Sequence, residues 1–135
     1  MQNLIYAIIQ VIHNFGAAAV VGTAASALWL VRDSAAARRR LALFMVIAWA
    51  TQLASGVLFG ATTYYFERHL PDIHGIAVDA LLVKICCAAA GFVLAVSYRK
   101  TGSAWLRSKQ DFAWRGLLSL GVIALAAAAF LRWFS

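Results

Sequence analysis

Charged residues are scarce in this chain. Asp, Glu, Lys and Arg make up 13% of its 135 residues, whereas 64% of the residues are hydrophobic, and the mean hydropathy is +0.80. A water-soluble domain of this size needs a far more polar surface. The scarcity of charge therefore excludes an ordinary soluble domain and predicts a protein that resides in lipid.

The motifs of common catalytic and metal sites are also missing. The sequence has no glycine-rich phosphate loop, no paired carboxylates, and no C-x-x-C or H-E-x-x-H pattern. Its two cysteines, Cys86 and Cys87, are adjacent, so on a helix they point in different directions and do not make a natural metal pair. The first residues carry no basic charge, and the apolar run that follows is too long for a signal peptide. We therefore expect this run to be a helix of the folded protein.

What the sequence does contain is four apolar runs, each long enough to cross a membrane. A hydrocarbon core of about 30 Å takes roughly 20 helical residues, and in lipid each run must satisfy its backbone within a helix. The connections are short, so consecutive helices are expected to be antiparallel neighbours. The sequence thus predicts a single all-α domain, residues 1–135, forming a four-transmembrane-helix bundle in up-down-up-down order. Its helices are expected at about 4–31, 41–65, 76–98 and 114–134.

Lysine and arginine gather in the first and third connections, 32–40 and 99–113. The positive-inside rule places these two connections in the cytoplasm, which leaves the second connection, 66–75, and both termini on the other side. We expect a multi-pass protein of a bacterial inner membrane with periplasmic N- and C-termini. The net charge of +7 then reflects topology and contacts with anionic lipid of the bilayer, not binding of nucleic acid.

Aromatic and small residues are placed as such a bundle requires. Tyrosine and tryptophan near the helix ends predict an interfacial belt, formed by Tyr6, Tyr64, Tyr65 and Trp133 outside and by Trp29, Tyr98 and Trp114 inside. Gly56 and Gly60, with a stripe of Ala18, Gly22 and Ser26, predict close helix contacts within the chain, self-association being the alternative. The segment 103–114 is expected to lie along the cytoplasmic interface.

All three histidines are predicted to lie toward the outer face. His13 interrupts the first apolar run, and His69 and His74 are in the outer connection. Neutral imidazole ligates zinc, copper and iron, so the three rings form a candidate metal site if they converge. The alternatives are structural: a hydrogen bond from His13 to a neighbouring helix, and solvated side chains for His69 and His74.

Lys84 lies within the third apolar run, about 13 Å below Gly75 at the helical rise of about 1.5 Å per residue. A lysine at that depth must snorkel, pair with an acid, or bind an anionic group. Asp79 and Glu67 are candidate partners, and the carboxylate of a ligand is a third. A haem propionate is such a carboxylate, and an imidazole with a membrane cation suits haem b. The candidate cofactor-binding residues are therefore His13, Lys84 and a second ligand, His74 or His69.

Three short motifs stand in the first three runs. They are His13-Asn-Phe-Gly16 followed by Gly22, then Ser55-Gly56-Val57-Leu58, and Leu81-Leu82-Val83-Lys84. They resemble motifs of two families of small four-helix membrane proteins, the copper-resistance D-type proteins and the four-helix protoporphyrinogen oxidases. In the oxidase-type relatives a first-helix histidine and a third-helix lysine are associated with haem b and activity. The resemblance implies these roles for His13 and Lys84, or, in the copper-type relatives, copper handling at the inner membrane.

Three functions remain open on the sequence alone. The first is binding of haem b or a metal ion near the outer face, for redox or metal handling, with a larger membrane complex as partner. The second is copper transport or resistance. The third is a cofactor-free accessory subunit of a membrane enzyme.

Overall fold

The computed structural model describes residues 1–69 and 73–134, and within these residues every regular element is helical. Helix α1 spans Gln2–Ala25 and ends in a π-helical turn, Ser26–Leu30. Helix α2 spans Ala35–Glu67, α3 spans Ile76–Thr101 with a following 3-10 turn at Gly102–Ala104, and α4 spans Arg107–Phe134. Each of these four segments is long and apolar enough to cross a membrane. The predicted all-α fold with four such helices is confirmed.

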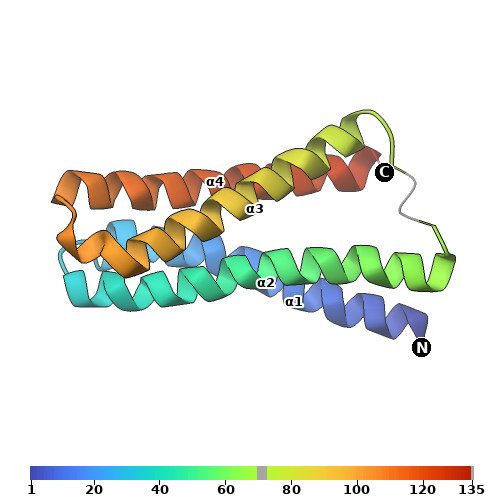
Figure 1. Ribbon diagram of the computed structural model, residues 1–135, viewed down its shortest axis with the longest axis horizontal. Helices are drawn as coiled ribbons and strands as arrows, with labels where there is room; N and C mark the ends of the chain where they lie inside the picture. Colours follow the sequence, from blue (N-terminus) through green and yellow to red (C-terminus); the bar gives the residue numbers. More distant parts are fainter. Residues whose placement is uncertain (70–72, 135) are drawn as a thin grey trace.

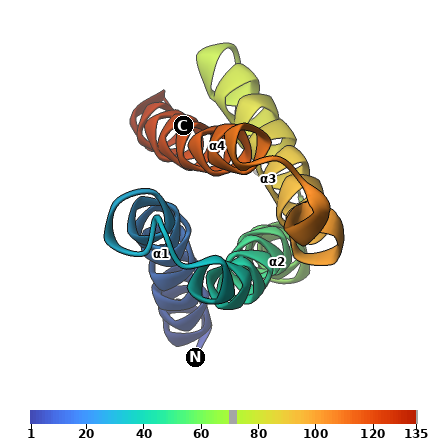
Figure 2. The same cartoon turned by 90° about the vertical axis from the view of Figure 1, so that its left-hand side faces the viewer.

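The helices pack as two pairs, α1 with α2 and α3 with α4, and α2 and α3 join the pairs. Figure 1 shows both chain termini at one end of the molecule, which we call the terminal end. The opposite end carries the connections 31–34 and 102–106, and we call it the basic end. Figures 1 and 2 show the two pairs close together at the basic end and diverging toward the terminal end.

The first connection is shorter than predicted, because Arg38, Arg39 and Arg40 are helical. Ser34 caps α2, its Oγ accepting a hydrogen bond from the backbone N–H of Ala37 at 3.2 Å. Serine is a favoured N-cap residue, and the three alanines that follow are strong helix formers. The first helix correspondingly ends at Leu30 and the second begins at Ala35, not at Leu41.

The third connection is also shorter than predicted. Helix α3 continues to Thr101, and α4 begins at Arg107, not at Trp114. The side-chain amide of Gln110 closes the turn by donating to the carbonyls of Gly102 at 2.8 Å and Trp105 at 3.1 Å. The segment 103–114 is therefore a tight turn plus the start of α4. In the second connection α2 extends to Glu67, and residues 70–72 lie outside the described part.

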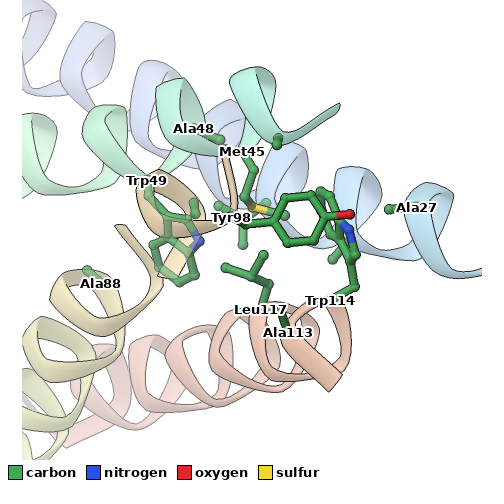
Figure 3. Packing of buried hydrophobic residues seen from close by; sticks show 13 residues of the cluster. Ala27, Met45, Ala48, Trp49, Ala88, Tyr98, Ala113, Trp114 and Leu117 are labelled. Carbon is green, nitrogen blue, oxygen red and sulfur yellow. The ribbon is translucent and has the colours of Figure 1, made fainter. Parts of the chain in front are cut away.

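The main hydrophobic core lies toward the basic end, where all four helices contribute to it (Figure 3). Trp49, Trp114 and Leu117 are 1%, 0% and 0% exposed. The prediction that Tyr98 and Trp114 belong to an interfacial belt is wrong, because both are buried and their rings pack at 5.1 Å. Trp29, Tyr64, Tyr65 and Trp133, in contrast, are exposed near helix ends.

The glycines that permit close packing are not those of the predicted small-residue motifs. Around Gly22, Gly56 and Gly60 there is open space within 4 Å of where a Cβ would lie, so the prediction of close helix contacts within the chain at these glycines is wrong, and self-association stays the alternative. Gly91 instead lies under the indole of Trp49, and a Cβ there would overlap the ring. The helices approach closely where a large side chain packs over a glycine of another helix. A G-x-x-x-G spacing alone does not show which side chain will pack there.

A cluster of ionic side chains ties the pairs together at the basic end. Arg38 is 1% exposed; its Nε donates to the carbonyl of Ala27 at 3.1 Å and its Nη2 to Asp111 Oδ1 at 2.6 Å. Arg107 and Arg32 also lie 3.5 Å and 3.9 Å from the Asp111 carboxylate. Arg38 thus connects α2 to the π-helical turn of one pair and to α4 of the other.

Candidate functional site

His13 is buried on the side of α1 that faces α2. The residue is 9% exposed, and its Nδ1 lies 2.6 Å from the hydroxyl oxygen of Ser55. The ring of Phe59 meets the imidazole edge-on, with the centroids 6.5 Å apart. The expected hydrogen bond from His13 to a neighbouring helix is confirmed. It occupies one ring nitrogen and leaves the other for a further role.

The backbone of His13 is held by the same helix. The side-chain amide of Gln52 donates to the His13 carbonyl at 2.6 Å. Gly16, one turn along α1, makes room for that amide, because a Cβ at this position would lie 2.5 Å from Gln52 Nε2. The H-x-x-G motif therefore has a physical basis in this chain: the glycine lets a glutamine reach the backbone of the histidine.

Ser55 and Gln52 are site residues whose contacts sequence reasoning missed. They are three residues apart in an otherwise largely apolar run, so they lie on one face of α2. Polar side chains inside a membrane helix tend to face other helices. The two polar residues on one face of α2 are the feature of the sequence that indicates where the partner of His13 lies.

Lys84, the second candidate residue, lies on α3 in the other helix pair. It is half-buried. Among the described residues no side chain forms a hydrogen bond or ion pair with it, and the candidate partners Asp79 and Glu67 do not contact it. A ligand carboxylate therefore stays the predicted partner of Lys84.

His69 and His74 are exposed residues of the outer connection. Between Ser55 and the end of α2 at Glu67 the chain rises by roughly 18 Å, at about 1.5 Å per residue, so His69 lies far from the level of His13. Its Nε2 is 3.9 Å from the Glu67 carboxylate. In residues 1–69 and 73–134, no three His, Cys, Asp or Glu side chains are grouped so as to hold a metal ion. The structure therefore does not bring His13, His69 and His74 together.

His13 and Lys84 are side chains of the kinds that can hold a haem. Haem iron takes only its axial ligands from the protein, and in several families a single histidine provides one. Histidines that ligate iron or zinc commonly have the other ring nitrogen hydrogen-bonded, as Nδ1 of His13 is to Ser55. The Lys84 ammonium adds a cation suited to a propionate carboxylate. His13 and Lys84 together would hold the iron and one carboxylate of the macrocycle.

Comparison with protein-family models, with curated protein sequences and with solved structures found no match for this chain. The resemblance to copper-resistance D-type proteins and to four-helix protoporphyrinogen oxidases therefore stays a prediction. The functional inference depends on the residues of the site.

Proposed function

We propose that this chain is an integral protein of a bacterial inner membrane that binds haem b toward its outer face. His13 would hold the iron through Nε2, and the Lys84 ammonium would pair with a propionate. The protein serves redox chemistry, alone or as a small subunit of a larger membrane complex.

The proposed topology is an antiparallel, up-down-up-down bundle with both termini in the periplasm. The four long apolar helices support insertion. The connections 31–34 and 102–106 lie at one end of the molecule, opposite the two termini (Figure 1), and the helix ends that adjoin them are rich in arginine and lysine. The positive-inside rule assigns that end to the cytoplasm.

The observation that carries the proposal is the presence of two ionisable side chains, the buried His13 and the half-buried Lys84, in long apolar helices. They lie in apolar segments of different helix pairs. Ionisable side chains are expensive within a membrane, so they mark functional sites by default. A ligand with an iron centre and a carboxylate would give both groups a partner.

Each residue of the site has one task in this proposal. His13 would supply a neutral nitrogen to the iron, and Lys84 would neutralise a carboxylate that is costly to leave unpaired in lipid. When bound, the haem would supply one-electron redox chemistry. The outer-connection histidines are not part of this set, because among the described residues no group of three His, Cys, Asp or Glu side chains includes them.

The test is a visible spectrum of the protein purified in detergent, with and without dithionite, together with metal analysis. The proposal predicts a Soret band and the sharpened visible bands of a reduced b-type haem. A colourless protein with stoichiometric copper would contradict it and favour copper transport or resistance. A colourless, metal-free protein that co-purifies with a large membrane enzyme would contradict it and favour an accessory subunit.

A further inference from the structure

The Ser55 hydroxyl stands between two polar atoms at short distance. Its oxygen lies 2.5 Å from the backbone carbonyl of Thr51 and 2.6 Å from Nδ1 of His13. A contact this short between two electronegative atoms needs a hydrogen between them. Two such contacts need two hydrogens, and the serine hydroxyl has one.

The carbonyl of Thr51 can only accept, so the hydroxyl hydrogen of Ser55 must point to it. The hydrogen of the second contact must then come from the imidazole. We propose that Ser55 is a positioning residue that fixes His13 with a proton on Nδ1 and leaves Nε2 as a bare, ligating nitrogen. The arrangement is a relay of two hydrogen bonds, from Nδ1–H to the Ser55 oxygen and from Ser55 O–H to the Thr51 carbonyl.

The surroundings of the ring keep this arrangement in place. Gln52 holds the His13 backbone at 2.6 Å, which sets the register of α1 against α2 at this level. Phe59 closes one side of the ring. In the part of the chain that the structure describes, Nε2 of His13 has no hydrogen-bond partner that would compete for it. The proton of the neutral imidazole therefore stays on Nδ1, and no neighbouring acceptor draws it to Nε2.

The inference deepens the proposed function, and it rests on that function only for what Nε2 ligates. The tautomer itself is a property of the protein without any ligand. Outer hydrogen bonds of this kind orient a ligating histidine and raise its basicity, and their loss commonly lowers affinity about 10- to 100-fold.

The experiment is nitrogen NMR of the haem-free protein in lipid nanodiscs, with 15N-labelled histidine. A His69→Gln/His74→Gln background leaves His13 as the one histidine. The expected spectrum has a protonated Nδ1 and an unprotonated Nε2. Ser55→Ala should shift the ring toward the Nε2–H form or a mixture, and Ser55→Thr, which keeps the hydroxyl, should restore the original form.

Thr63→Ala is the matched control. Thr63 is a hydroxyl residue of the same helix that donates to the Phe59 carbonyl and accepts from Tyr6, so its loss should leave the His13 spectrum unchanged. A proton on Nε2 or on both nitrogens of the parent protein, or an unaltered spectrum in Ser55→Ala, would overturn the inference. A correct tautomer in a protein that takes up no haem would leave the inference standing and reject the proposed function.

Discussion

Replacing Asp111 with alanine should destabilise the protein by about 3 kcal/mol or more. Arg38 is 1% exposed, and its Nη2 donates to Asp111 at 2.6 Å. Its Nη1 is already buried without a hydrogen-bond partner in the described part of the chain. Removing the carboxylate leaves a buried guanidinium whose one remaining hydrogen-bond partner among the described residues is the Ala27 carbonyl. The free energy of unfolding, measured by denaturant titration in mild detergent, reports the loss.

Asp33→Ala is the control for this variant. Asp33 also pairs with an arginine, its carboxylate lying 3.1 Å from Arg107, but its side chain is 96% exposed. Exposed ion pairs contribute little, so this variant should unfold almost as the parent does. Equal stabilities of Asp111→Ala and Asp33→Ala would show that Arg38 finds other partners and that the ionic cluster does not hold the two helix pairs together.

Replacing His13 with alanine should abolish measurable haem binding. Loss of an outer hydrogen bond alone weakens a metal–ligand site by about 10- to 100-fold, so loss of the ligand itself should raise the Kd at least about 100-fold. Haemin is titrated into haem-free protein in detergent, and the Soret absorbance is followed. Circular dichroism checks that the variant keeps its helices, which we expect because alanine is a strong helix former.

His69→Ala is the matched control, since it removes an imidazole of the exposed outer connection. It should leave the titration unchanged. Haemin binding that survives His13→Ala, or that is lost in His69→Ala, would place the ligand elsewhere than in the first helix.

The helices were predictable because the sequence contains four long apolar runs. A run of this kind is expected to satisfy its backbone within a helix, and all four runs are helical. The residues at which the helices begin and end were harder to predict. Arg38 to Arg40 are helical because Ser34 caps the helix ahead of them, a local hydrogen bond that hydropathy does not register.

The residues of the site were predictable in part. His13 and Lys84 stand out because ionisable groups are rare in apolar runs. The contacts of Ser55, Gln52 and Gly16 required the register of α1 against α2, which no short motif fixes. Arg38 was missed for a related reason: one arginine of a basic run is buried, and its partner, Asp111, lies 73 residues away along the chain.

The most direct test of the His13 site is pulsed electron paramagnetic resonance of the haem-loaded, ferric protein labelled with 15N-histidine. We predict strong coupling of the iron to one labelled histidine nitrogen, retained in His69→Ala. Ferric haem without histidine coupling, or a protein that takes up no haem, would contradict the assignment of His13 as the ligand.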